Sequence, residues 1–230
     1  MRLTIDDIAR QYGQFVSSLC RRMILNDETA QDAAQEVWIE VMNSLPSFEE
    51  RSKFSTWLYT IATRVIKRVA WQERSYSVKA LKDFFHQQEW ELPQESWFVK
   101  ERWAKEMCDK CLTGILHCLD NDARLVYVCR ELAQLPFSEI ADIMGQEETA
   151  IRKMVSRSRR KLQNFLTDEC ALYNPQGQCR CRMNRHVQDI RLLEEFERLR
   201  QTVKRINLLR ASEALLPNKN YWLQFQQPSE

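Results

Sequence analysis

The sequence predicts an all-α protein, with two small helical domains joined by a linker and a helical extension at the C-terminus. Two observations on composition favour this class: only 4 of the 230 residues are glycine and 6 are proline, while 29% are charged. Few chain-breaking residues and many charged ones are typical of helices rather than sheets. The third observation is that apolar residues recur at steps of three and four in most segments, which is the helical period.

The first 74 residues carry this period in three successive segments. In each segment the apolar positions fall on one face of a helix, and the other face is polar. Residues whose side chains can cap a helix stand at the starts of the second and third segments. The expected helices run over residues 5–25, from Asn26 or Asp27 to a break at Pro46, and from Ser55 or Thr56 to Val69.

Charge separates the second of these segments from the third. Residues 26–50 contain seven acids and no base, whereas residues 51–74 contain six bases and one acid, although the formal net charge of the chain is only +2. An acidic surface suits a protein partner, and a basic surface suits nucleic acid. Aromatic residues beside a basic helix can also stack on unpaired bases. The candidates for stacking are Phe54, Trp57, Tyr59 and Trp71, each with core packing as the alternative.

Residues 136–162 predict two short helices joined at a turn. Ser138 is expected to cap the first helix. Gly145 is expected to end it in a left-handed conformation, which suits a residue without a Cβ. In the second helix one narrow stripe is expected to face inward. Its members are Ile151, Val155, Ser158 and Leu162.

The outer face of this second helix is basic. Between Ala150 and Leu166 the chain has six bases and no acid. An amphipathic helix of this kind, held across a short turn from another helix, is typical of a helix-turn-helix whose second helix enters the major groove of DNA. The alternative is a solvated, charged surface on a helical bundle. Charge runs of this length rarely lack acids, so we expect the helix to bind DNA.

The first cysteine cluster is best explained by core packing. Cys108 and Cys111 are followed by His117 and Cys118, a spacing that also occurs in zinc sites. The three cysteines, however, fall on one apolar helical stripe, where a thiol behaves as a small hydrophobe. Cys20 and Cys129 also lie on apolar faces, and we expect them to be buried.

The second cluster has different surroundings. Cys170, Cys179, Cys181 and His186 lie around a turn instead of on an apolar stripe. Three thiolates and one imidazole could close a tetrahedral zinc site, or the thiols could sense redox state. The alternative is a reduced loop that docks the tail. No cofactor is required by any other part of the sequence.

Other functional classes are not supported by the sequence. No segment approaches the roughly 20 apolar residues that span a bilayer, and no export signal is present, so we expect no membrane insertion and a cytoplasmic location. No paired carboxylates, nucleophile–base arrangement or phosphate-binding glycine loop can be recognised. We therefore do not expect an enzyme.

Two parts of the chain resemble a known family. The segments QDAAQEVWIEV (Gln31–Val41) and FSTWLYTIATRVIKRV (Phe54–Val69) make residues 5–74 similar to region 2 of a bacterial sigma factor. The helix-turn-helix makes residues 109–166 similar to region 4. With no room for further regions, the chain resembles the extracytoplasmic-function (ECF) class of the sigma-70 family.

The resemblance implies a division into domains and a set of partners. The expected parts are a region 2-like domain at 1–74, a linker at 75–107, a region 4-like domain at 108–166 and an extension at 167–230. The implied partners are core RNA polymerase, through the clamp of its largest subunit, and promoter DNA. An anti-sigma factor is a further candidate partner. The extension, with a packing helix expected at 187–216, is expected to modulate promoter binding.

The resemblance also assigns residues to each contact. For polymerase these are Asp32, Gln35, Glu36 and Glu40. For capturing and melting the minus-10 element they are Lys53, Phe54, Trp57, Tyr59, Thr60, Thr63, Arg64, Lys67, Arg68 and Trp71. For the minus-35 element they are Arg152, Lys153, Ser156, Arg157 and Arg160.

The chain departs from the family pattern at three of its positions. Arg64 and Arg68 stand where the family commonly has Asn and then Asp, which leaves the identity of the minus-10 bases open. Glu147 stands where a hydroxyl residue usually caps the recognition helix. Two other interpretations remain: a stand-alone helix-turn-helix regulator that does not bind polymerase, and a metal or redox sensor.

Overall fold

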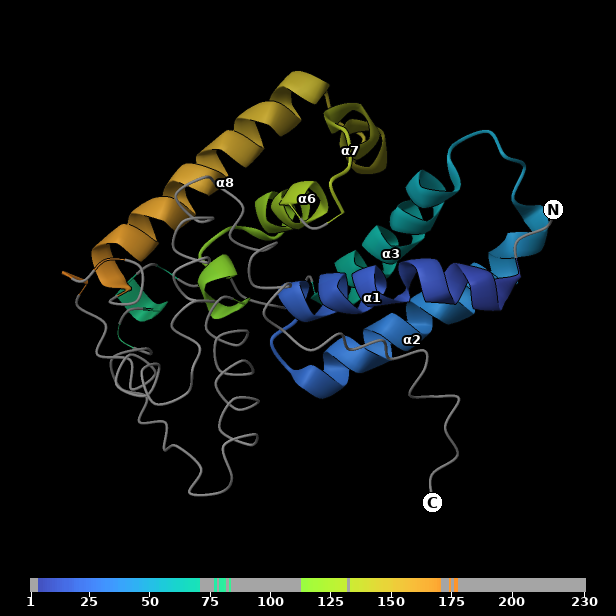
Figure 1. Cartoon of the computed structure of the whole chain (residues 1–230), viewed down its shortest axis with the longest axis horizontal. Helices are drawn as coiled ribbons and strands as arrows, with labels where there is room; N and C mark the ends of the chain where they lie inside the picture. Colours follow the sequence, from blue (N-terminus) through green and yellow to red (C-terminus); the bar gives the residue numbers. More distant parts are fainter. Residues whose placement is uncertain are drawn as a thin grey trace, which may run out of the picture. The chain divides into compact units, whose positions relative to one another are not determined.

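The computed structural model describes residues 4–70, 77, 79–81, 83, 113–131, 133–170, 174, 176 and 177 (Figure 1). Within these residues every regular element is a helix, which confirms the predicted all-α class. The elements are α1 (Ile5–Met23), α2 (Asp27–Ser44), the short 3-10 helix η1 (Leu45–Ser47), α3 (Phe54–Ala70), α6 (Asn121–Glu131), α7 (Phe137–Met144) and α8 (Glu148–Glu169). No helix among the described residues is both long and apolar enough to cross a membrane.

The described residues fall into two compact units. The first contains α1, α2 and α3 together with Asn121–Met154, and the second contains the described residues of Ser75–Asp120 and Val155–Pro217. Helices α6 and α7 therefore pack with the N-terminal helices. The predicted extension helix at 187–216 lies outside the described residues, as does nearly all of the predicted linker at 75–107.

Caps set the starts of the first two helices. Thr4 Oγ1 accepts a hydrogen bond from the backbone N–H of Asp7 at 3.2 Å, and the Asp7 carboxylate accepts one from the backbone N–H of Thr4 at 3.2 Å. This reciprocal capping box satisfies two backbone donors at the start of α1. Asn26 accepts from the backbone N–H of Thr29 at 2.9 Å, so the predicted cap of α2 is confirmed.

Helix α3 begins slightly earlier than the sequence predicted. Its first residue is Phe54, because the carbonyl of Lys53 already accepts from the N–H of Trp57 at 3.1 Å. Packing explains the difference: the Phe54 ring lies 5.5 Å from that of Phe48 and 5.3 Å from that of Trp57, measured between ring centroids. These ring contacts hold Phe54 in the first turn.

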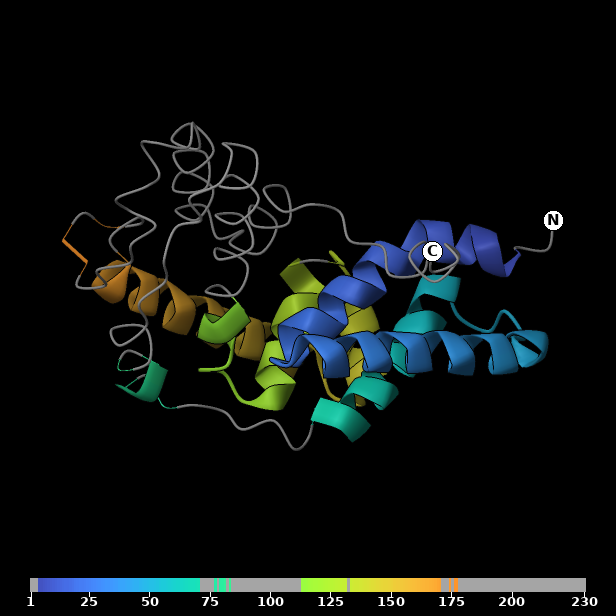
Figure 2. The same cartoon turned by 90° about the horizontal axis from the view of Figure 1, so that it is seen from below.

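The core of the first unit lies where α1, α2 and α3 pack together. Helices α1 and α2 run side by side in both views, and α3 packs on both of them (Figures 1 and 2). Helix α6 contacts α1, and α7 contacts α3. The fully buried side chains include Ile8, Leu19, Val37, Leu58 and Val65.

The turn between α7 and α8 is as predicted at Gly145, but the cap at Ser138 is wrong. Gly145 has φ 63° and ψ 38°, and the N–H groups of Gly145 and Gln146 donate to the carbonyls of Asp142 and Ala141. These two bonds form a Schellman motif. Helix α7 begins at Phe137, because Pro136 supplies an extended residue whose carbonyl accepts the first helical bond. Ser138 therefore lies inside the first turn and makes no cap.

The inward stripe of α8 is confirmed. The exposed fraction of each stripe residue is 2% or less, for Ile151, Val155, Ser158 and Leu162. The helix continues to Glu169, and Glu169 is buried. The regular structure thus extends three residues beyond the boundary expected at residue 166.

Three of the four cysteines that the structure describes follow the core-packing interpretation. Cys20, Cys118 and Cys129 are buried. Burial raises the pKa of Cys20 and of Cys129 to about 12, because the low-dielectric interior disfavours the thiolate. Cys108 and Cys111 lie outside the described residues.

Candidate nucleic-acid and polymerase interfaces

The outer face of α8 carries all five residues predicted for the minus-35 contact. Each of them is exposed: Arg152, Lys153, Ser156, Arg157 and Arg160. The turn at Gly145 separates this face from α7. Four guanidinium or ammonium groups and one hydroxyl on one helical face can bind phosphates and reach base edges. Lys161 belongs to the same basic run but donates to the carbonyl of Cys118 at 2.6 Å.

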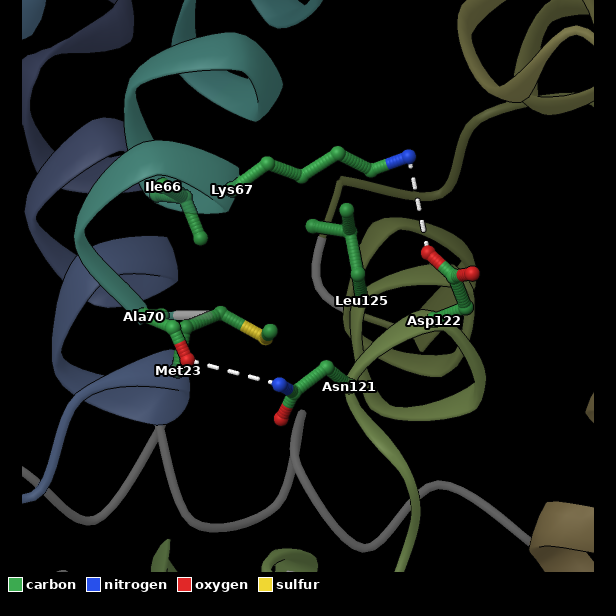
Figure 3. Close-up of a pocket in the computed structure, with 7 residues that line it drawn as sticks. All are labelled: Met23, Ile66, Lys67, Ala70, Asn121, Asp122 and Leu125. Carbon is green, nitrogen blue, oxygen red and sulfur yellow. Dashed lines mark hydrogen bonds and ion pairs between the residues drawn. The ribbon is translucent and has the colours of Figure 1, made fainter. Parts of the chain in front are cut away.

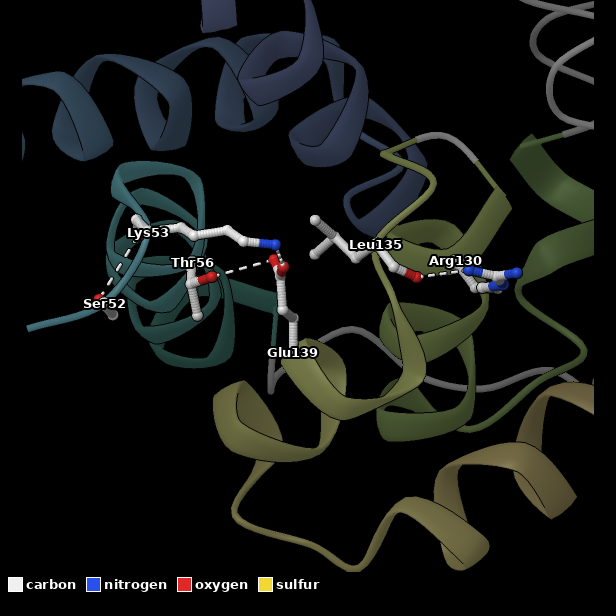
Figure 4. A network of polar contacts seen from close by, with 6 residues as sticks. All are labelled: Ser52, Lys53, Thr56, Arg130, Leu135 and Glu139. Carbon is white, nitrogen blue, oxygen red and sulfur yellow. Dashed lines mark hydrogen bonds and ion pairs between the residues drawn. The ribbon is translucent and has the colours of Figure 1, made fainter.

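Two arginines, Arg130 and Arg152, contact the aromatic ring of Phe137 at the start of α7. The guanidinium carbon of Arg152 lies 4.3 Å from the centroid of the Phe137 ring, and that of Arg130 lies 4.5 Å from it. Arg130 also donates to the carbonyl oxygen of Leu135 at 2.7 Å (Figure 4). Arg152 donates to the Glu148 carboxylate, one helical turn away. Both cations are therefore held at two points each.

Part of the predicted minus-10 surface is occupied by α7. The Glu139 carboxylate binds two groups at the start of α3, accepting from Lys53 Nζ, just before the helix, at 2.5 Å and from Thr56 Oγ1, in its first turn, at 3.0 Å (Figure 4). The Lys53 side chain is 72% exposed and that of Glu139 only 13%. The sequence did not single out Thr56 or Glu139 for this contact. The one available signal was that Thr56 is one helical turn from Lys53.

A second junction lies at the other end of α3. Lys67 Nζ is 3.4 Å from an Asp122 carboxylate oxygen, and the Asn121 amide donates to the carbonyl of Ala70 at 3.4 Å (Figure 3). Between them is a cavity of about 10 Å³, whose apolar wall includes Met23 and Leu125. That volume holds about one water molecule, so it is too small for a ligand. This end of α3 is a packing junction with α6.

The aromatic candidates divide between the core and the surface. Tyr59 is only 6% exposed and packs against Tyr12 and Phe15, with ring centroids 6.3 Å and 4.5 Å away. Burial raises the pKa of Tyr59 well above its ordinary value. Phe54 and Trp57 are half-buried, so part of each ring is accessible.

Four further candidates for the minus-10 contact have different positions. Thr63 is only 4% exposed. At Thr63, as at Tyr59, the structure therefore favours core packing over the predicted contact with DNA. Thr60 is half-buried and donates to a backbone carbonyl of its own helix. Arg64 is exposed, and Trp71 lies outside the described residues.

Arg68 links the two predicted interfaces of the first unit. Its guanidinium donates to Glu40 at 2.9 Å and to Glu36 at 2.6 Å. The hydrogen bond that Arg68 donates to Glu40 and the negative charge of Glu36 raise the pKa of Arg68 above its ordinary value. A residue that was predicted to contact DNA thus holds two that were predicted to contact polymerase. The sequence assigned all three residues but could not indicate that they meet.

The outward face of α2 is both acidic and apolar. Asp32 is exposed, Gln35 is half-buried, and Ile39 and Met42 are 52% and 40% exposed. Exposed apolar side chains that are surrounded by polar ones can mark a protein interface. The sequence analysis missed Ile39 and Met42. The sequence did contain a signal for them, because both are apolar but fall outside the apolar stripe that packs α2 against the core.

The second cysteine cluster is only partly described. Cys170 is half-buried at the end of α8, and the other three members, Cys179, Cys181 and His186, lie outside the described residues. Among the residues that are described, no three metal-binding side chains come together. Zinc binding by the complete cluster stays a prediction.

Comparison with known proteins gives two matching families and a set of relatives. The family descriptions are Sigma-70 region 2, over residues 8–75, and Sigma-70, region 4, over residues 109–162. The RNA polymerase sigma factor YlaC of Bacillus subtilis (strain 168) is 30% identical over 167 residues, which cover 72% of this chain and 94% of the relative. The chain belongs to the sigma-70 family. The ECF RNA polymerase sigma factor SigW of the same organism is 29% identical over 171 residues, covering 70% of this sigma factor and 88% of the relative, which supports the ECF class.

Two solved structures share the fold of this sigma factor. One is CnrH in complex with the cytosolic domain of CnrY, with a TM-score of 0.54, 17% identity, and coverage of 70% of this chain and 86% of that chain. The other is the sigma factor RpoE in complex with the anti-sigma factor NepR from Bartonella quintana, with a TM-score of 0.50, 17% identity, and coverage of 70% and 97%. At this identity the likeness concerns the fold.

Proposed function

We propose that this ECF sigma factor directs core RNA polymerase to specific promoters and initiates transcription there. The observation that carries the proposal is the separation of charge between two helices. The outward face of α8 is basic and carries four exposed cationic side chains. Helix α2 instead presents acidic side chains beside exposed apolar ones. A stand-alone regulator that binds only DNA would have no use for the second face.

Attachment to polymerase is assigned to α2. Asp32, Gln35, Glu36 and Glu40 would meet basic residues on the clamp of the largest subunit, and Ile39 adds an apolar centre. An interface of this kind combines a desolvated apolar patch with charges that guide association. Arg68 supports the proposal because it aligns two of the acids on one side of α2.

DNA contact is assigned to α8 and α3. The basic face of α8 would lie in the major groove of the minus-35 element, where its phosphate contacts provide affinity and its base contacts specificity. On α3, the exposed Arg64 and the half-buried Phe54 and Trp57 would take part in opening the minus-10 element. Lys53 would join them once the Glu139 carboxylate no longer holds it.

The proposal includes the place of action and the absence of catalysis in the chain itself. The chain would act in the cytoplasm, where polymerase carries out the chemistry.

An anti-sigma protein is a further proposed partner. Both similar structures are complexes with a second protein, and in one of them this second protein is named as an anti-sigma factor. Copurification of the tagged chain from its host would test this.

Run-off transcription with purified core polymerase tests the proposed function. We expect the complete chain to support specific initiation that falls steeply as salt rises, because phosphate contacts release counterions. Core polymerase alone and the chain alone are the controls. Failure of the chain to associate with core polymerase at modest ionic strength would contradict the proposal.

Two expectations for the C-terminal part are tested separately. Metal analysis of the purified chain, and of a Cys179→Ser/Cys181→Ser variant, decides between zinc binding and a reduced loop. One zinc per chain in the wild type that is lost in the variant supports the site.

Removal of residues 178–230, which leaves α8 complete, tests whether the extension modulates promoter binding. Unchanged transcription from the promoter would count against a role of the extension.

A further inference from the structure

The Phe137 ring lies where three helices of the region 4 match meet. Phe137 is the first residue of α7, Arg130 comes from the last turn of α6, and Arg152 comes from the second turn of α8. The ring is half-buried, and the two guanidinium carbons are 4.5 Å and 4.3 Å from its centroid. Arg130 is tied to the carbonyl of Leu135 and so holds the ring from α6.

Glu148 constrains Arg152 in a different direction from the ring. One oxygen of the carboxylate, Oε1, accepts from both Nε and Nη2 of Arg152, at 2.8 Å and 2.5 Å. A guanidinium close above an aromatic face tends to lie along it, and a carboxylate that binds one edge fixes the rotation within that plane. Together, Phe137 and Glu148 set both the plane and the direction of the arginine.

The two bonds to Glu148 leave one edge of Arg152 for a ligand. A guanidinium has five N–H groups, and the pair of bonds to Glu148 uses one on Nε and one on Nη2. The remaining edge, formed by Nη1 and Nη2, has two parallel donors. No acceptor for this edge is found among the described residues, and the side chain is 58% exposed. Two parallel donors match the O6 and N7 acceptors of guanine in the major groove.

We propose that Phe137 and Glu148 are positioning residues that aim this edge of Arg152 at one guanine of the promoter duplex. The inference rests on the proposed function and goes further, because it assigns a base and two supporting residues that do not touch DNA. An i,i+4 ion pair alone would give Arg152 only a weak tether. Contact with the ring from a neighbouring helix fixes the arginine relative to α7 as well as to its own helix.

The test uses the full-length chain bound to core polymerase and a set of promoter duplexes with single base-pair changes. We expect the wild type to lose about tenfold in affinity when one particular guanine is replaced by adenine, or by 7-deazaguanine, which lacks the N7 acceptor. Phe137→Leu removes the ring face and should lose most of this discrimination. Phe137→Tyr keeps the ring and should retain it.

Affinity for unrelated duplex DNA and its salt dependence separate positioning from a structural role. Both should stay within about twofold of the wild type in Phe137→Leu, because the number of phosphate contacts is unchanged. Equal loss on every duplex, or unchanged discrimination in Phe137→Leu, would overturn the inference. Glu148→Gln keeps the size and shape of a side chain that is 40% exposed, so the fold should be retained, and it should also reduce discrimination at the same guanine.

Failure of the inference can be told from failure of the proposed function. If the wild-type complex shows no preference among duplexes and no transcription, the proposed function fails. If it prefers one promoter but neither Phe137→Leu nor Glu148→Gln changes the preference at any guanine, only the positioning role fails. Arg152→Lys should abolish the guanine preference, since an ammonium group cannot form the bidentate contact.

Discussion

Glu139 of α7 holds Lys53 at the start of α3 with a 2.5 Å contact, and its second carboxylate oxygen accepts from Thr56 at 3.0 Å. Lys53 is one of the residues assigned to the minus-10 element. The positive charge of Lys53, which would meet DNA, is therefore paired with the carboxylate of Glu139 in α7, the first helix of the helix-turn-helix. The Glu139 carboxylate therefore competes with a DNA phosphate for the charge of Lys53.

The first prediction is that Glu139→Gln strengthens binding of single-stranded minus-10 DNA by about two- to fivefold, the range that corresponds to a surface ion pair. The glutamine can still accept from Thr56, so the free energy of unfolding should fall by no more than about 1 kcal/mol. Fluorescence anisotropy with a labelled oligonucleotide and chemical denaturation measure the two effects.

Glu147→Gln is the matched control, because Glu147 is exposed in the same segment and the substitution makes the same change in net charge. We expect no more than a slight effect from it. Equal strengthening by both variants would mean that only the overall charge matters and that the contact with Lys53 plays no part.

The contact at Glu139 also shows why part of the site could not be predicted. Glu139 and Lys53 are 86 residues apart in the chain, and no local pattern pairs them. Tyr59 is a similar case, since an aromatic residue on a basic helix could face bases or the core. Only the position of α1, which brings Tyr12 and Phe15 against it, decides for the core.

Features that depend on neighbouring residues were predicted well. Gly145 was placed correctly because its left-handed conformation is a local requirement of the chain reversal. The buried stripe of α8 follows directly from the helical period. Ser138 was assigned wrongly as a cap because a favourable residue type was weighed without Pro136, which takes the cap position itself and starts the helix two residues earlier.

The second prediction concerns the apolar centre on α2. Ile39→Glu should weaken association with core polymerase at least tenfold, because a charge in the centre of an interface must be desolvated without a partner. The side chain is 52% exposed, so the fold should be unaffected. Leu25→Glu, at a position that is 40% exposed outside α2, is the control and should leave the affinity unchanged. Surface plasmon resonance with immobilised core polymerase gives both affinities.

The third prediction is a dependence of stability on pH that arises from the cap of α1. Hydrogen bonds from the side chain and backbone of Thr4 lower the pKa of Asp7 below its ordinary value of 3.8. A lowered folded-state pKa means that the ionised carboxylate stabilises the fold at pH values above 3.8, and that this contribution is lost as pH falls through the folded-state pKa. Asp7→Asn should therefore lower the Tm at pH 7.

The difference in Tm between wild type and Asp7→Asn should narrow as pH falls below 3.8 and the wild-type carboxyl becomes protonated as well. Thermal unfolding followed by circular dichroism at several pH values measures it. Asp6→Asn is the control, because Asp6 lies in the same turn but takes no part in the capping box. A gap for Asp7→Asn that stays constant with pH would show that the charge is not involved.

The fourth prediction concerns the thiols in the core. Burial raises the pKa of Cys129 and of Cys20 to about 12, so at pH 8 neither should react with iodoacetamide while the chain is folded. In denaturant both should be alkylated. Peptide mapping by mass spectrometry follows each cysteine separately. Rapid alkylation of Cys129 in the folded chain would show that the packing of α6 opens readily.

The fifth prediction separates the two surfaces through one exposed arginine of α8. Arg157→Ala should weaken binding of the promoter duplex and leave association with core polymerase unchanged, because Arg157 and the acidic face of α2 lie on different helices. If the arginine contacts one phosphate, the slope of log affinity against log salt should become shallower by about 0.9. A loss of specificity without a change of slope would instead indicate contact with a base edge. Equal losses for polymerase and for DNA would indicate misfolding, which circular dichroism of the variant would detect.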